Sequence, residues 1–373
     1  MKAGEAARAV FEAEFGSEPE GCWCAPGRVN LIGEHVDYAG GLCLPIALPQ
    51  VTTVAMRRRA DGRLRIRSSG FDPVDIDLRD RQIDGWAAYV AGVAWALEPP
   101  GFAGADIAIA SEVPVGAGLS SSAALETAVA VALADLCGLP LDDEGRERLA
   151  EACVRAENDY AGAPTGGLDQ RIALHGRAGH ALLLDFADGT SDHIPFDAGK
   201  QGLTVLVVDT GTGHRLADGQ YGQRRREVED ATRLLDVGSL REARSAEPIA
   251  DPLLHRRARH VIGEISRVRQ AAESLRAGRI RDLGPLLDAS HRSLRDDFEV
   301  SCLELDTAVD AAVAAGALGA RMVGGGFGGS VIALCEDARV DDVRQAVADA
   351  AARRDLPAPA FLRASASGGA RRC

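Results

Sequence analysis

The chain has 373 residues, of which 46% are hydrophobic, and a formal net charge of −13 at pH 7 with a sequence pI near 5.2. This length exceeds what one small core usually organises, so two domains are expected. The acidic balance argues against a nucleic-acid-binding protein, which needs clustered lysine and arginine, and the arginine triplets at 57–59 and 224–226 are interpreted as short solvated faces.

Membrane insertion and disulfide formation are not expected either. No apolar run reaches the ~18 residues that a membrane-spanning helix needs, and the first residues carry charges without the apolar stretch of a secretory signal. The eight cysteines include no Cys-x-x-Cys, so we expect reduced thiols that mostly fill the core, and no zinc site. The expectation is a cytoplasmic monomer with no membrane or nucleic-acid partner.

The first half of the chain mixes helices and strands. Helices are predicted, from the spacing of apolar residues, over 3–15, 86–97, 121–137 and 143–161. Strands are predicted, from alternation of apolar and polar residues, at 51–57, 63–67, 74–78 and 105–113.

The second half begins with a segment, 181–203, in which Asp, Gly and Pro recur at close intervals. We place the domain boundary there, which predicts domains at 1–200 and 201–373. Strands are predicted at 203–208 and 331–335, and helices near 220–236, 252–277, 303–319 and 339–353. The tail 365–373 is expected to be frayed. This mixture indicates an α+β (α/β-mixed) protein.

The densest group of polar side chains lies near the start of the chain. An arginine (Arg28), two carboxylates (Glu34 and Asp37) and an imidazole (His35) fall within ten residues, between glycines. Hydrogen-bond acceptors in a row suit a ligand that presents a row of hydroxyls, as sugars do. A solvated loop is the alternative for an isolated Glu-His pair, but complementary motifs at three later places favour the ligand.

A second motif, Pro114-Val-Gly-Ala-Gly-Leu-Ser-Ser-Ser122, joins a predicted strand to a predicted helix. Gly116 and Gly118 allow a tight turn, and the helix start offers unpaired N–H groups that favour phosphate. The alternative is an ordinary serine N-cap, but one serine would suffice for that. The motif is not a Walker A loop, because the chain lacks Gly-x-x-x-x-Gly-Lys-Ser/Thr.

A third motif, a Pro/Gly turn over 161–170 that includes Pro164, delivers one acid, Asp169. A carboxylate near Arg28 and a sugar hydroxyl could accept the hydroxyl proton during phosphoryl transfer. Glu157, on the preceding helix, could join Ser122 as an oxygen ligand of Mg²⁺, which takes few protein ligands. Taken singly, both acids are also common turn and helix residues.

A fourth motif, Gly324-Gly-Gly-Phe-Gly-Gly329, formally matches Gly-x-Gly-x-x-Gly. The dinucleotide fingerprint must follow a strand and open a helix. Here a predicted helix precedes and a strand follows, so we interpret the segment as backbone packed beside a ligand. A purely structural glycine turn is the alternative.

Together these motifs resemble those of the GHMP family of small-molecule kinases, and within it the galactokinases. The resemblance spans nearly the whole chain and rests mainly on segments 25–38, 113–123, 166–170 and 320–330. It implies an N-terminal domain like ribosomal protein S5 domain 2, a ferredoxin-like C-terminal domain and an active site in the cleft between them. It also implies phosphorylation of D-galactose at the anomeric hydroxyl to α-D-galactose 1-phosphate, with ATP as donor and Mg²⁺ as cofactor.

The resemblance assigns roles to the candidate residues. It implies that galactose contacts Glu34, His35, Val36 and Asp37, with Tyr221 closing over the sugar. It implies Asp169 as the catalytic base and Arg28 as the cation that lowers the pKa of this base and stabilises transition-state charge. It places the nucleotide phosphates on Gly116, Ala117, Gly118, Leu119, Ser120, Ser121 and Ser122, with Trp86 near the adenine. It places magnesium on Ser122 and Glu157.

The chain departs from the family pattern beside the sugar. Val36 stands where threonine is usual, and Gly167-Leu168 where Ile-Met is common. These positions bear on the choice of sugar, so a related kinase acting on N-acetylgalactosamine or arabinose is an alternative. A sugar- and ATP-binding sensor without catalysis is another, which need not keep Ser122, Glu157 and Asp169 together.

Overall fold

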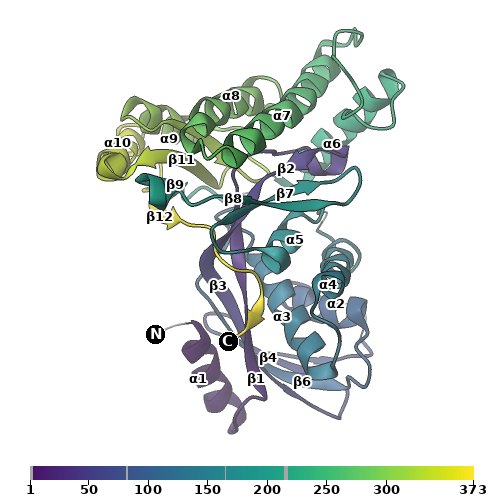
Figure 1. Cartoon of the computed structure of the whole chain (residues 1–373). Coiled ribbons are helices and arrows are strands. Elements are labelled where there is room, and N and C mark those ends of the chain that lie inside the picture. Colours follow the sequence, from purple (N-terminus) through teal and green to yellow (C-terminus); the bar gives the residue numbers. More distant parts are fainter. Residues whose placement is uncertain (1–2, 81–82, 164, 214–216) are drawn as a thin grey trace.

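The computed structural model describes residues 3–80, 83–163, 165–213 and 217–373, which form two parts joined by long strands (Figure 1). Pro164 of the predicted turn therefore lies outside the described residues. Among the described helices, none combines the length and the apolar character needed to cross a membrane.

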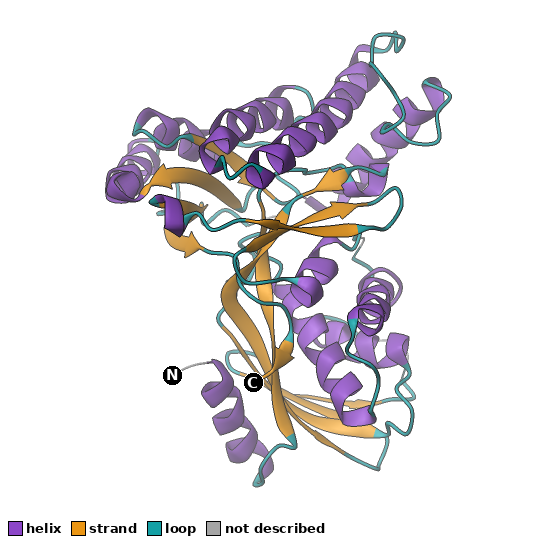
Figure 2. Cartoon of the chain, in the orientation of Figure 1, coloured by secondary structure: helices purple, strands orange, loops and turns teal. Residues whose placement is uncertain are grey.

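The first part is a six-stranded sheet with helices on both faces (Figure 2). Its strands, in the spatial order β13-β1-β3-β6-β4-β5, are β13 (Arg371–Arg372), β1 (Gly21–Asn30), β3 (Pro45–Arg58), β6 (Gly104–Ser111), β4 (Arg63–Ser68) and β5 (Val74–Asp77). Neighbouring strands are antiparallel except β4 and β6. The helices are α1 (Ala3–Phe15), α2 (Ala87–Leu97), α3 (Ser121–Cys137), α4 (Asp143–Arg155) and α5 (Leu168–His175), with a π-helical turn (Ala156–Tyr160) after α4.

The alternation of side chains along β1 explains why both faces of this sheet are covered. Cys22 packs with Phe11 under α1, whereas Trp23 and Ala25 face the opposite core with α2 and α3. Alanine forms helices well and is small, so the alanine-rich α3 is buried around most of its circumference against β1, β3 and α2. The start of α3 is thereby fixed beside the end of β1, where the N–H of Arg28 donates to the carbonyl of Leu119.

The second part is an antiparallel four-stranded sheet beneath a layer of helices (Figure 1). Its strands, in spatial order, are β10 (Gly319–Val323), β11 (Ser330–Glu336), β9 (Leu203–Asp209) and β12 (Ala360–Ala364). The helices are α6 (Ala217–Leu234), α7 (Pro252–Arg276), α8 (Leu283–Asp296), α9 (Leu303–Ala314) and α10 (Val340–Arg353). Short 3₁₀ helices occur at Asp37–Ala39, Gly199–Gln201, Ile280–Asp282 and Asp337–Arg339.

A third sheet lies between the two parts and consists of β2 (Leu42–Cys43), β7 (His180–Asp185) and β8 (Ser191–Pro195). The largest hydrophobic cluster runs through this junction. It joins residues 29–48 and the buried side chains of Ala117 and Leu119 to α7, β10 and β11. The polar motifs of the sequence are thus held by a core to which both parts contribute.

Several sequence expectations need correction. The segment 181–203, in which we place the domain boundary, contains most of the hairpin of β7 and β8. The predicted helix 303–319 ends at Ala314, where Gly316 takes a φ of 96° and the Ala317 N–H caps the Ala312 carbonyl, so that β10 can begin at Gly319. The helix α8 was not predicted. Since β10 precedes the glycines at 324–329, they join two strands of a hairpin and do not follow a helix directly.

The expectation of a frayed tail is wrong. Ala370 is buried, and its N–H donates to the carbonyl of Ala173 at 2.7 Å. Beyond it, β13 pairs with β1, and the N–H of Cys373 donates to the carbonyl of Cys22 at 2.9 Å. The end of the chain therefore returns to the first sheet, and the division at residue 200 stays a prediction.

Candidate active site

A polar cavity of about 190 Å³ opens where the two parts meet. The cavity is lined by residues of β1, the segment 33–37, the π-helical turn after α4, the turn before α5, α5 itself, α6 and the glycines after β10. These residues are Arg28, Gly33, Glu34, His35, Asp37, Glu157, Thr165, Gly166, Leu168, Asp169, Tyr221, Gly324 and Gly325. Six of the predicted catalytic and sugar-contacting residues, separated by up to 193 positions, therefore meet here (28 to 221).

Arg28 and Asp169 form a bidentate ion pair at one wall of the cavity. Nε and Nη2 of Arg28 each lie 2.7 Å from a carboxylate oxygen of Asp169, and the two side chains are 11% and 23% exposed. The Ser120 hydroxyl donates to the same carboxylate. Burial acts to lower the pKa of Arg28, but the charge and hydrogen bonds of Asp169 outweigh it and raise that pKa. The guanidinium therefore stays charged and makes charge-assisted hydrogen bonds to the Asp169 side chain.

The segment 33–38, here called the acceptor loop, carries Glu34 and His35 against the glycines at 324–329, here called the glycine loop. Oε1 of Glu34 accepts the N–H of Gly324 at 2.9 Å and lies 3.0 Å from Nη2 of Arg321, a fully buried residue of β10. One carboxylate oxygen of Glu34 is thus held, which leaves the other oxygen available to a ligand in the cavity.

His35 uses both ring nitrogens within the protein. Nε2 lies 3.1 Å from the carbonyl of Gly325, and Nδ1 lies 3.0 Å from the hydroxyl of Tyr38. Burial lowers the pKa of His35 to about 3, so the ring is neutral, with the hydrogen on Nε2 donating to Gly325 and Nδ1 accepting from Tyr38. His35 lines the cavity, but its nitrogens tie the acceptor loop to the glycine loop.

Asp37 and Tyr221 also line the cavity. A Cβ atom on Gly166 would lie 2.0 Å from the carboxylate of Asp37, so only glycine leaves room for that carboxylate. Burial, with the charges of Glu34 and Asp169, raises the pKa of Asp37 to about 6. The ring of Tyr221, on α6, lies 5.3 Å from that of His35.

Val36 is not a cavity residue. Its side chain is fully buried in the junction core, and it packs so closely on Gly41 that a Cβ there would meet it at 2.6 Å. The Val36 departure from the family pattern therefore does not change the lining of this cavity. Gly167 precedes α5 with a φ of 91°, a conformation that favours glycine.

The predicted phosphate loop, residues 116–122, leads into α3 beside the ion pair. Gly116, Gly118 and Ser120 all have positive φ values, of 80°, 73° and 59°. The side chains of Ala117 and Leu119 point into the junction core and are 1% and 2% exposed. These two residues therefore offer a ligand only their backbone, whereas Ser120, Ser121 and Ser122 are partly exposed.

Ser122 and Glu157 meet next to this loop. The Ser122 hydroxyl donates to Oε1 of Glu157 at 3.1 Å. Burial and the charge of Asp169 raise the pKa of Glu157 to about 7. Within the described ranges no group of three or more His, Cys, Asp or Glu residues has metal-binding geometry. Two oxygen ligands beside a phosphate loop still fit Mg²⁺, which keeps several waters and binds phosphate oxygens.

Trp86 lies apart from the cavity. It precedes α2 and packs at the edge of the core that Trp23 and Ala25 form with α2 and α3, and its ring centre is 5.3 Å from that of Phe71. Its place near the adenine stays a prediction.

Helix α7 supports the acceptor loop, a role that the sequence did not suggest. His260 and Glu264, one helical turn apart, are fully buried. Nε2 of His260 lies 3.1 Å from the carbonyl of Glu34, and the N–H of Gly33 donates to Glu264 at 3.0 Å. Only the i, i+4 spacing of two polar residues on an otherwise apolar face could have signalled this in advance.

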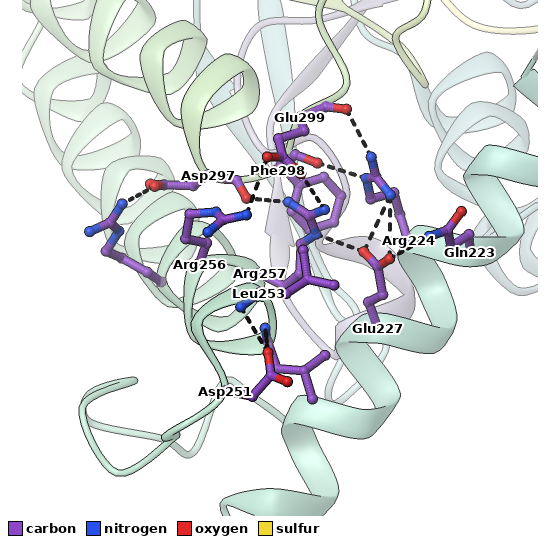
Figure 3. Close-up of polar contacts among 12 residues, drawn as sticks. Gln223, Arg224, Glu227, Asp251, Leu253, Arg256, Arg257, Asp297, Phe298 and Glu299 are labelled. Atoms are coloured by element: carbon purple, nitrogen blue, oxygen red, sulfur yellow. Dashed lines mark hydrogen bonds and ion pairs between the residues drawn. The ribbon is translucent and has the colours of Figure 1, made fainter.

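A cluster of buried arginines anchors α6, and with it Tyr221 (Figure 3). Nε of Arg224 donates to the carbonyl of Phe298 at 2.7 Å, and Arg257 bridges Glu227 and Glu299 at 2.7 and 2.6 Å. The Phe298 ring lies 4.8 Å from that of His35. The interpretation of 224–226 as a solvated face is therefore wrong for Arg224. In the triplet 57–59, Arg57 and Arg59 pair with the buried Asp106, whereas Arg58 is exposed, as expected, and pairs with Glu20.

Comparison with known proteins places these observations in a family. The galactokinase galactose-binding signature matches residues 9–58, the GHMP kinase N-terminal domain 88–177 and the GHMP kinase C-terminal domain 271–353. The chain is 47% identical to a galactokinase of Streptomyces coelicolor, over 97% of this chain and 96% of that one. It is 45% identical to a galactokinase of Mycobacterium tuberculosis, over 94% and 98%.

Solved structures agree with these matches. The structure of Lactococcus lactis galactokinase complexed with galactose superposes with a TM-score of 0.92 at 33% identity, covering 99% of both chains. Methanococcus jannaschii mevalonate kinase superposes with a TM-score of 0.67 at 16% identity, over 94% of this chain and 98% of that one. The second likeness concerns the fold alone.

Proposed function

The chain belongs to the galactokinase family of GHMP kinases, and on that premise we propose that it transfers the γ-phosphoryl group of ATP to the anomeric hydroxyl of galactose in the cavity between its two parts. The resemblance stated from the sequence and the two-domain GHMP kinase fold are confirmed. The observation that carries the proposal is the Arg28–Asp169 pair. It shares the cavity with the carboxylates of the acceptor loop, and Ser120 of the phosphate loop donates to Asp169.

Galactose would bind by hydrogen bonds to the free oxygen of Glu34 and to Asp37, under Tyr221. His35 would contribute through its ring face and by fixing the glycine loop, because both of its nitrogens are engaged. This arrangement would hold one sugar hydroxyl against Asp169, and such positioning supplies much of the catalysis in phosphoryl transfer.

Asp169 would accept the proton of the attacking hydroxyl. A carboxylate has about four lone-pair sites, and Arg28 and Ser120 use three of them, which leaves one for the sugar. Asp169 would take the proton as the sugar oxygen becomes acidic during bond formation to phosphorus. Arg28 also offers positive charge to the phosphoryl group in transit.

The N–H groups of the phosphate loop and the start of α3 would bind the phosphates of ATP. Ser122 and Glu157 would hold Mg²⁺, which neutralises phosphate charge when bound. We further propose a monomer as the working unit and a cytoplasmic location, where the eight unpaired cysteines would stay reduced.

The test is an ADP-release assay with a panel of galactose, N-acetylgalactosamine, arabinose and glucose. The proposal expects the highest kcat/KM with galactose. If another sugar is preferred, the substrate assignment is wrong. If no sugar is turned over, the kinase assignment fails in favour of a non-catalytic sensor.

A further inference from the structure

Three successive carbonyl groups of the phosphate loop are held by donors from outside it. The Ser330 hydroxyl donates to the carbonyl of Ala117 at 2.6 Å. Nη1 of Arg28 donates to the carbonyl of Gly118 at 2.5 Å, and the backbone N–H of Arg28 donates to the carbonyl of Leu119 at 3.0 Å. The first of these donors comes from the second part of the protein, 213 residues away along the chain.

Holding a carbonyl fixes the N–H of the next residue. In a trans peptide the C=O and N–H groups point in opposite directions. The N–H groups of Gly118, Leu119 and Ser120 therefore point away from the three donors. With positive φ at Gly118 and Ser120, successive N–H groups form the kind of backbone concavity that binds anions.

Ser330 is a rigid support for this arrangement. It is fully buried and begins β11, where it pairs with Val323 of β10 on one side and with Asp209 of β9 on the other. Its backbone therefore lies inside a sheet, and its hydroxyl can hold the loop in one place. The preceding glycine loop contacts Glu34 and His35. The connection between β10 and β11 therefore supports the acceptor loop at its start and the phosphate loop at its end.

We propose that Ser330 is a positioning residue for nucleotide binding: its hydroxyl holds the Ala117 carbonyl away from the ligand, so that the N–H groups of the phosphate loop face the phosphates. The inference rests on the proposed function only in taking the triphosphate of ATP as the anion. Loss of the Ser330 hydroxyl should therefore weaken nucleotide binding and leave sugar binding intact. The hydroxyl contacts the phosphate loop, whereas the glycine loop contacts Glu34 through the backbone N–H of Gly324.

The test is Ser330→Ala, with the Kd of Mg²⁺ and a non-hydrolysable ATP analogue, and the Kd of galactose, each measured by calorimetry on the full chain. Losing the buried donor should raise the Kd of the analogue about tenfold and leave that of galactose unchanged. KM for ATP should rise in parallel, with a smaller change in kcat. Ser330→Cys, which keeps a weak donor, should fall between Ala and wild type.

The matched control is Thr204→Val. Thr204 lies on β9, next to β11, and its hydroxyl donates to Asp337 at 2.6 Å, far along the sheet from the phosphate loop. Removing this hydroxyl should not change the Kd of the analogue. Circular dichroism melting establishes whether each variant is folded. If Ser330→Ala does not fold, the Kd values of Ser330→Cys decide the test.

Two results would overturn the inference: a folded Ser330→Ala with wild-type affinity for the analogue, or an equal loss of affinity for sugar and analogue, which indicates a general structural defect. The outcome for the proposed function is separate. Wild-type protein that binds the analogue but phosphorylates no sugar refutes that function, whereas the analogue affinities of the variants still decide the role of Ser330.

Discussion

Replacing Glu264 by glutamine should weaken galactose binding about tenfold and leave the rate at saturating substrate nearly unchanged. Glu264 does not line the cavity, but it accepts the N–H of Gly33 at 3.0 Å, and Gly33 begins the acceptor loop. The perturbation therefore tests whether α7 positions the sugar-binding groups from behind.

The expected loss of affinity is estimated from the hydrogen bonds that the Glu264 carboxylate accepts. It is fully buried and accepts the N–H of Gly33, the hydroxyl of Ser290 at 2.7 Å and Nε of Arg267 at 2.7 Å. Burial acts to raise the pKa of Glu264, but Arg267, His260 and Arg321 outweigh it and lower that pKa to about 2. Glutamine keeps one acceptor oxygen but loses the charge, and losing one charge-assisted hydrogen bond costs roughly 1.5–3 kcal/mol. At the lower end this is about tenfold in Kd.

The assay is galactose titration by calorimetry, with kcat at saturating galactose and ATP. The control is Glu273→Gln, since Glu273 is exposed on the same helix. A wild-type Kd for galactose in folded Glu264→Gln would refute the reasoning, as would a large fall in kcat with an unchanged Kd. Because the folded pKa lies below the ordinary 4.5, the charge of Glu264 stabilises the wild type above about pH 4.5, and this contribution is lost as pH falls toward 2. The difference in Tm between wild type and variant should shrink over that range.

Three further predictions follow from the cavity. Arg28→Lys keeps the charge but loses the bidentate contact and the bond to Gly118, so kcat should fall about 10²-fold in the ADP-release assay; a rate near wild type would contradict the role of the guanidinium. The Asp37 carboxylate has a pKa raised to about 6, so this group lowers the stability of the wild type as pH rises from 3.8 through 6. Asp37→Asn should therefore show a smaller fall in Tm over this range, yet bind galactose more weakly, and a Tm below that of wild type at pH 7.5 would refute this. Ser122→Ala should raise the Mg²⁺ concentration needed for half-maximal rate several-fold, and an unchanged Mg²⁺ titration would remove Ser122 from the metal site.

Local signals predicted the secondary structure well where they were strong. The helix at 121–137 was predicted with its observed bounds, because alanines fill it and Gly138 ends it with a φ of 72°. The short strands β7 and β10 were missed, since segments of six and five residues that mix apolar residues with His, Asp, Gly or Arg carry no clear periodicity. The tail was misread because its order comes from pairing with β1, about 350 positions away, which no local pattern encodes.

The candidate site shows the same division. Gly-rich motifs with charged residues identified Arg28, Asp169 and the phosphate loop, and the structure brings them together. Val36 and His35 were predicted as sugar contacts because they lie between Glu34 and Asp37 in the sequence. In the structure the Val36 side chain is buried in the core, and both ring nitrogens of His35 bond to other residues of the protein. His260, Glu264 and Ser330 are ordinary polar residues of helix and strand, and only tertiary contacts reveal their partners.

The central claim is that Asp169 accepts the proton of a galactose hydroxyl beside the triphosphate of ATP. The most direct measurement is ³¹P NMR of the product made by wild type and by Asp169→Asn, with galactose affinity measured for both. Wild type should place the phosphate on the anomeric oxygen, and Asp169→Asn should have a kcat lower by about 10²–10⁴ with sugar binding retained. Phosphate on another hydroxyl, or a variant as fast as wild type, would contradict it.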